Sequence, residues 1–196
     1  MSDVSTTISL RRPALTEALL NAGLSSVDRG TDLSVLLDHT HHLLLDSNGN
    51  REQVGEALDG LFGGLYRHKL SSTDEAWQAA VDQCRVHPLL RTIHEDPFTG
   101  RAFAKPRGYA GDAELLDLIY GPEERWPEPA ATALGLDIYR YTSAAPAAEG
   151  VRARRGFVAD LIDRTTAEKP GQHVLAIAAG HLREANLTAS VRRRRL

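Results

Sequence analysis

The stretch that decides the fold class is HVLAIAAG, residues 173–180. It is a short apolar run between Gly171 and Gly180, and sequence of helical pattern lies before and after it. A strand buried in the middle of a parallel sheet has this composition. The sequence therefore predicts one strand near 173–178, then a glycine turn, then a helix within HLREANLTASV, residues 181–191.

The order strand, glycine turn, helix is the layout of a nucleotide-type cofactor site. Free N–H groups and the positive end of the helix dipole meet at such a turn. Gly180 stands alone in this turn, and Leu182 and Glu184 occupy positions where further glycines often lie. The pattern alone favours an ordinary strand-to-helix loop, and a cofactor turn stays open as the alternative.

A lone parallel strand would leave its backbone N–H and C=O groups without partners, and buried groups of that kind are costly. No other run in the sequence resembles a buried strand. We therefore expect the remaining strands to lie beyond Leu196, which would make this chain the N-terminal, truncated portion of a longer α/β enzyme.

The rest of the sequence reads as helix. A loose polar arm is expected over 1–12, and apolar stripes at spacings of three and four predict helices over 31–46 and 51–70. The stripe residues are Leu33, Leu36, Leu37, Leu44, Val54, Leu58, Leu61 and Leu65. Further helices are predicted over 13–24, 72–86, 113–120 and 145–168, with a short one beginning near Pro88.

A glycine-rich charged loop stands directly in front of one of these helices, in AKPRGYAGDAELLDLIY, residues 104–120. Lys105 and Arg107 supply positive charge, Tyr109 supplies a flat face and a hydroxyl, and Asp112 can cap the helix. Composition alone favours a structural interpretation, in which Asp112 is only a cap, Tyr109 lies in the core and Arg107 pairs with a carboxylate. The alternative is a ligand-binding loop, in which Gly108 and Gly111 let the backbone approach a ligand closely.

Charge and composition limit the partners. A net charge of −3 argues against general affinity for nucleic acid or anionic membrane, and no apolar run is long enough to span a bilayer. The sequence opens without a secretory signal, and its one cysteine, Cys84, cannot form an internal disulfide, so we expect a cytoplasmic protein. His39 and His42 are spaced as one turn of helix, but a metal site needs three or four ligands, so no metal is predicted.

One long segment resembles a known family. HPLLRTIHEDPFTGRAFAKPRGYAGDAELLDLIYG, residues 87–121, is similar to a bacterial group of class I S-adenosylmethionine-dependent methyltransferases. One branch of that group is associated with making 3-hydroxypalmitic acid methyl ester. APAAEGVRARRGFVADLID (145–163) and VLAIAAGHLREA (174–185) look like the same family in the same order.

The resemblance implies S-adenosylmethionine as methyl donor and VLAIAAGHLREA as the first strand and motif I, where the donor binds. It implies that the loop before residue 113 folds over the donor or substrate pocket, with Arg107 holding a carboxylate. The donor-binding residues implied in this way are Arg107, Gly108, Tyr109, Gly111, Asp112, Ala179, Gly180 and Glu184. Catalytic residues stay unidentified, since methylating a carboxylate needs alignment and exclusion of water more than acid–base chemistry.

The predicted fold class is mostly α: a helical N-terminal domain followed by the first strand and helix of a truncated Rossmann-like α/β methyltransferase domain. We place the arm at 1–12, the helical domain with the PRGYAGD loop at 13–144, and the start of the methyltransferase domain at 145–196. The expected substrate is a small or fatty-acid-like carboxylate. We also expect weak or no donor binding by this chain alone and self-association through the incomplete domain. The alternative is a non-catalytic helical module that binds a ligand or partner.

Overall fold

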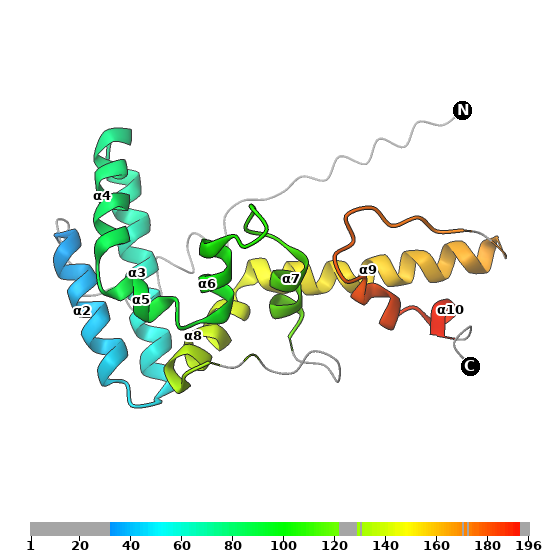
Figure 1. The fold of residues 1–196 in the computed structure, drawn as a ribbon, viewed down its shortest axis with the longest axis horizontal. Helices are drawn as coiled ribbons and strands as arrows, with labels where there is room; N and C mark the ends of the chain where they lie inside the picture. The colour runs from blue at the N-terminus through cyan, green and yellow to red at the C-terminus, as the bar shows by residue number, and fades with distance from the viewer. Residues whose placement is uncertain (1–31, 122–128, 130, 170, 172, 193–196) are drawn as a thin grey trace.

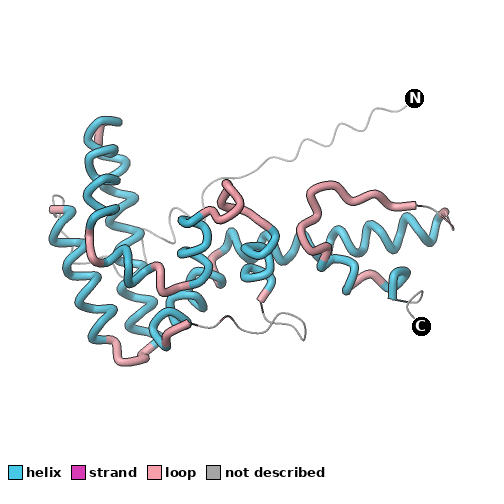
Figure 2. Tube along the Cα trace, in the orientation of Figure 1, coloured by secondary structure: helices cyan, strands magenta, loops and turns pink. Residues whose placement is uncertain are grey.

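The structure, a computed structural model, describes residues 32–121, 129, 131–169, 171 and 173–192. All regular secondary structure in these residues is helical (Figures 1 and 2). The elements are α2 (Leu33–Asp46), α3 (Arg51–Ser71), α4 (Asp74–Val86), α5 (Leu89–Ile93), α6 (Pro97–Ala104), α7 (Ala113–Tyr120), α8 (Ala133–Ser143), α9 (Pro146–Glu168), the 3-10 helix η1 (Arg183–Asn186) and α10 (Ala189–Arg192). The predicted arm at 1–12 and helix at 13–24 lie outside the described residues.

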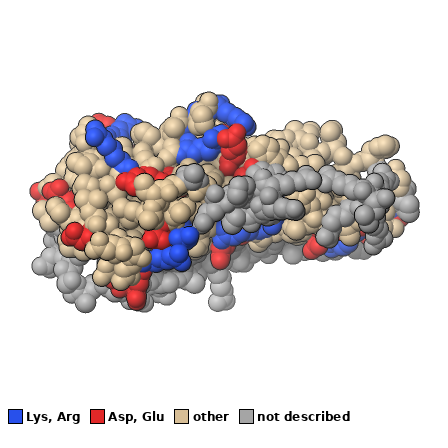
Figure 3. Space-filling model, turned by 60° about the horizontal axis from the view of Figure 1, so that its bottom comes forward, with Lys and Arg blue, Asp and Glu red and all other residues tan. Residues whose placement is uncertain are grey.

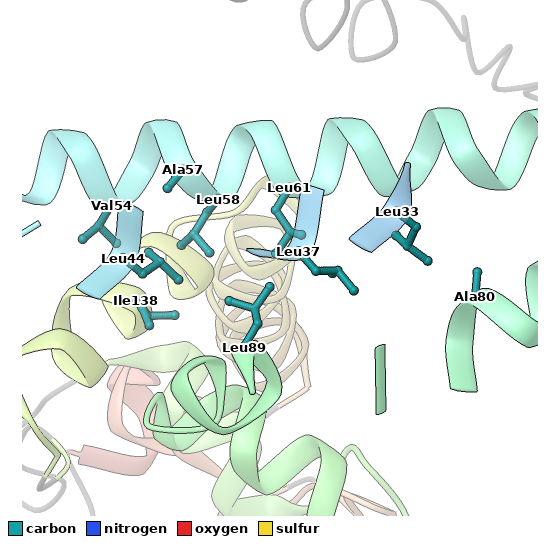
Figure 4. Close-up of a cluster of buried hydrophobic side chains, with 10 residues drawn as sticks. All are labelled: Leu33, Leu37, Leu44, Val54, Ala57, Leu58, Leu61, Ala80, Leu89 and Ile138. Atoms are coloured by element: carbon teal, nitrogen blue, oxygen red, sulfur yellow. The ribbon is translucent and has the colours of Figure 1, made fainter. Parts of the chain in front are cut away.

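The molecule is elongated, with α2, α3 and α4 at one end and the long helix α9 reaching to the other (Figure 1). The main core forms where α2 and α3 pack side by side against α5 and α8 (Figure 4). The predicted stripes of α2 and α3 are confirmed, because their leucines and Val54 are buried in this core or packed against it. Gly64 lets the two helices approach, since a Cβ there would lie 2.5 Å from Leu36 Cδ2.

Side-chain caps fix where most of the helices begin. Thr73 caps α4 by accepting a hydrogen bond from the N–H of Ala76, so this helix begins two residues after the predicted start at residue 72. Asp96 caps α6, a helix that the sequence analysis missed, by accepting from the N–H groups of Phe98 and Thr99 at 2.8 and 3.2 Å. The Asp-Pro pair at 96–97 was the available signal, because aspartate is favoured at the N-cap and proline at the first helical position.

A second, smaller cluster joins the middle of the chain to α9. Leu115 and Ile119 of α7 are buried with Ala148 of α9, and Leu116 packs against them. The predicted end of α9 just before Pro170 is confirmed. Towards the C-terminal end of this helix, Leu161 and Thr165 are exposed.

The predicted strand is wrong. Residues 173–178 form neither strand nor helix, and no strand occurs among the described residues (Figure 2). The mostly helical part of the predicted fold class agrees with the structure, whereas the first strand of a Rossmann-like domain does not. A strand needs a neighbouring strand to pair its backbone groups, and the described part of this chain supplies none.

The apolar side chains of this segment lie open to solvent. Leu175 is 84% exposed and Ile177 is 82% exposed, so this apolar run is poorly covered. The residues after it also depart from the expected helix, because they divide into η1 and the short α10. The predicted division of the chain at 144/145 falls between α8 and α9 and stays a prediction.

Candidate functional site

The loop that joins α6 to α7, residues 105–112, is a tight turn in which residues 105–111 are exposed. Lys105 ends α6 in the left-handed conformation, with φ of 47°, and accepts a hydrogen bond from the N–H of Gly108 at 2.8 Å. Gly108 has φ of 84°, which explains why a glycine stands there. Tyr109 is exposed and therefore does not lie in the core.

An ion-pair network holds the two ends of this loop together. Arg101 of α6 donates to Asp112 through Nε at 2.8 Å and Nη2 at 2.5 Å, and its Nη1 lies 2.6 Å from Glu114 Oε2. Asp112 is buried and caps α7 by accepting from the N–H of Leu115 at 2.9 Å. The hydrogen bonds from Arg101 are the main cause that lowers the pKa of Asp112 to about 2.

Arg107 joins the same network from the loop. Its Nη2 lies 2.8 Å from Glu114 Oε1, and its Nε lies 3.9 Å from Asp112 Oδ2. Asp112 and Arg107 thus make the contacts that the structural interpretation of the loop requires. The ligand-binding roles expected for them, and for Gly108, Tyr109 and Gly111, stay predictions. Figure 3 shows basic and acidic side chains lying next to one another over the middle of the molecule.

The turn over 178–184 has an unusual backbone. Ala178, Gly180 and Leu182 all have positive φ, of 54°, 58° and 50°. Two of these residues carry a Cβ, and such a conformation is costly for them. The N–H of Leu182 bonds to the carbonyl of Ala179 at 2.9 Å, so the chain reverses sharply just before η1.

This turn packs against the first half of α7. A Cβ on Gly180 would lie 3.3 Å from Leu116 Cδ1 and 3.6 Å from Ala113. Because Asp112 caps α7, the turn and the 105–112 loop are connected through one short helix. The structure therefore brings together the two segments for which the sequence predicted donor binding, although they are about 70 residues apart in the sequence.

Polar contacts lock the turn to α7. His181 Nδ1 lies 2.5 Å from Asp117 Oδ2, and the buried guanidinium of Arg183 donates to the carbonyls of Asp117 and Gly121 at 3.1 and 3.0 Å. The same guanidinium lies over the Tyr120 ring, 5.2 Å from its centre. Sequence reasoning missed His181, Asp117 and Arg183, because only the fold brings residues so distant in sequence together.

Glu184, a predicted donor-binding residue of the turn, has one buried carboxylate oxygen without a hydrogen-bond donor among the described residues. It is 8% exposed, and no described group donates a hydrogen bond to its Oε2. A buried carboxylate oxygen is unfavourable without a donor. Glu184 can therefore accept a hydrogen bond from an amine or hydroxyl of a ligand that reaches the turn.

Within the described residues, no three His, Cys, Asp or Glu side chains are placed to hold a metal ion. His42 Nδ1 instead lies 2.7 Å from the backbone carbonyl of Asp38. In the same part of the chain, every helix is too short or too polar to cross a membrane.

Comparison with known proteins gives one partial likeness. The chain is 30% identical over 98 residues to the tRNA 5-methylaminomethyl-2-thiouridine biosynthesis bifunctional protein MnmC of Cupriavidus metallidurans. The match covers 47% of this chain and 14% of the length of that protein. No family model matches the chain, and no solved structure matches it.

Proposed function

We propose that this chain is part of an S-adenosylmethionine-dependent methyltransferase, and that the donor binds where the 178–184 turn meets α7. The buried oxygen of Glu184 carries this proposal, because it is a hydrogen-bond acceptor that the described protein leaves unsatisfied. The family-like segments 87–121 and 174–185 both contribute to this place. The partial likeness to a protein that makes a methylated aminomethyl group is consistent with methyl transfer.

The residue types at this place match the functional groups of the donor. S-adenosylmethionine carries an amine, ribose hydroxyls, an adenine ring and a carboxylate. Glu184 can accept from the amine or a hydroxyl, the exposed ring of Tyr109 can stack, and Arg107 can hold the carboxylate. Arg107 would have to exchange its contact with Glu114 for the new one. Its side chain is 47% exposed, so this exchange is inexpensive.

Two observations suggest different methyl acceptors. The family resemblance implies a small or fatty-acid-like carboxylate. The name of the bifunctional protein describes an aminomethyl group that carries a methyl, which would make the acceptor an amine. The two differ in chemistry, because a carboxylate attacks without losing a proton whereas an amine must lose one.

A non-catalytic helical binding module is the second candidate, and the exposed segment over 173–178 favours it. Val174, Leu175 and Ile177 offer apolar surface that a protein partner would cover. This candidate predicts association with protein and no specific contact with a methyl donor.

Ultraviolet cross-linking with methyl-labelled S-adenosylmethionine distinguishes the two candidates, because it captures weak complexes. We expect label in peptides containing 178–184 or 105–117, removed by excess S-adenosylhomocysteine. Gly180→Val should abolish that label while helices α2 and α3 keep their melting behaviour. Absence of label, or label that S-adenosylhomocysteine does not displace, would reject the methyltransferase proposal.

A further inference from the structure

His181 and Asp117 form a carboxylate–imidazole pair at the junction just described. The Nδ1–Oδ2 distance is 2.5 Å, and the two side chains are 37% and 10% exposed. His181 directly follows Gly180 in the turn, and Asp117 lies on the middle of α7. The pair therefore joins the two segments of the candidate donor site.

Arg183 fixes the carboxylate of this pair. Its Nη1 lies 3.1 Å from the backbone carbonyl of Asp117 and 3.4 Å from Oδ1, while Nη2 donates to Gly121. Because Arg183 engages one oxygen, the other is directed to the histidine. Asp117 is thus held in place before any ligand binds, and it orients the imidazole in turn.

Such a pair sets the tautomer of the histidine. An ionised Asp117 accepts the hydrogen of Nδ1, so Nε2 is the basic nitrogen of a neutral ring. A carboxylate behind the ring also stabilises the imidazolium that forms when Nε2 takes a proton. An imidazole held in this way is suited to serve as a general base.

We propose that His181 is the general base of the methyl transfer and that Asp117 is its positioning residue, so the acceptor is an amine or hydroxyl. This inference rests on the proposed function. The acceptor nitrogen or oxygen forms a bond to the methyl carbon of the sulfonium donor, and the carbon–sulfur bond breaks with its electron pair going to sulfur. The proton of the acceptor moves to His181 Nε2. A carboxylate acceptor has no proton to lose, so its methylation would not need this pair.

The first test is nitrogen NMR of the full chain, which reads the histidine tautomer directly. In the wild type we expect the Nδ1 signal of His181 to be that of a protonated ring nitrogen and the Nε2 signal that of an unprotonated one. Asp117→Asn should move the hydrogen towards Nε2. His39, which is exposed and far in sequence from both residues of the pair, serves as an internal reference that the substitution leaves unchanged.

A wild-type His181 ring protonated at Nε2 would contradict the role of this pair as a base. A tautomer that Asp117→Asn does not change would contradict it too. This tautomer measurement needs no ligand, so its result is valid whether or not the chain binds a methyl donor. Saturable shifts of His181 with S-adenosylhomocysteine support its placement at the donor site. Shifts confined to other residues overturn that placement, whereas no shifts at all count against the proposed function.

The acceptor class is tested by methyl-labelled S-adenosylmethionine with hexylamine and hexanoate as competing probes. Label on hexylamine that is lost in His181→Gln supports the proposal. Label on hexanoate alone, or on neither probe, overturns the assignment of the acceptor.

Discussion

Arg101 and Asp112 form a two-bond ion pair that closes the loop between α6 and α7. Their atoms are 2.8 and 2.5 Å apart, and the carboxylate is buried while it caps α7. The sequence analysis named Arg107, not Arg101, as the candidate functional cation. In the structure Arg107 contacts the half-exposed Glu114 at the edge of this pair. The two arginines therefore have different expected contributions to stability.

Arg101→Ala should lower the free energy of unfolding by about 3 kcal/mol, because it removes one partner of a buried ion pair. Arg107→Ala should lower it by less than about 1 kcal/mol, as is usual for an exposed ion pair. Denaturant unfolding of both variants measures the difference, with Arg85→Ala, which removes an exposed pair on α4, as the control. An Arg107→Ala variant that is as unstable as Arg101→Ala would show that the loop depends on Arg107 for its structure.

The stability that Asp112 contributes should depend on pH in the acid range. Its pKa in the folded protein is lowered to about 2, below the usual value of about 4 in an unfolded chain. The unfolded state therefore binds more protons in this window, and folding is favoured as the pH rises. The contribution should be complete above about pH 4 and be lost as the pH falls towards about 2.

Thermal melting between those pH values tests this dependence. Asp112→Asn keeps a capping side chain but cannot titrate, so its melting temperature should fall less steeply with acid than that of the wild type. Parallel curves for the two proteins would contradict the ionised pair.

A close approach in α8 predicts a glycine requirement that the sequence did not reveal. A Cβ on Gly135 would lie 2.7 Å from the carbonyl carbon of Glu95, which is backbone and next to the buried cap Asp96. Gly135→Ala should therefore destabilise the protein by about 2 kcal/mol or more, as overpacking does. Gly60→Ala, at an open position in α3, should instead stabilise it by up to about 1 kcal/mol. Equal stability of the two variants in denaturant would contradict the packing of α8.

The helices were largely predictable because their signals are local. Leucine spacing, the threonine cap of α4 and the proline after α9 each act within a few residues. The candidate site was predictable only in part. Gly180 and Glu184 stand out in the sequence, but the pair of His181 with Asp117 spans 64 positions, and no local pattern encodes it.

The strand was predicted wrongly for a physical reason. HVLAIAAG has the composition of a buried strand, but composition does not supply a neighbouring strand with which to pair. Helix α6 was missed because Gly108 and Gly111 favour a loop, and the segment between the short helix near Pro88 and residue 113 was expected to be loop. Its cap, Asp96, also bonds Thr142 of α8 at 2.9 Å, a contact that only the fold could show.

The uncovered segment predicts self-association. Leu175 and Ile177 are almost fully exposed, and apolar surface of this kind favours contact between chains. Sedimentation velocity should show association that increases with concentration, and Leu175→Lys with Ile177→Lys should abolish it. Substituting Val35, an exposed residue of α2, with lysine is the control. A wild type that remains monomeric at every concentration would contradict this expectation.

The proposed donor site is tested most directly by a titration of nitrogen-labelled protein with S-adenosylmethionine, followed by NMR in the wild type and in Glu184→Gln. We expect weak, saturable shifts at Gly180, Glu184 and the first half of α7. Glu184→Gln should weaken this binding and leave the protein at least as stable, because a neutral amide is less costly to bury than a carboxylate without a donor. Shifts that do not saturate, or a Glu184→Gln variant that binds normally and unfolds early, would contradict the assignment of this turn as the donor site.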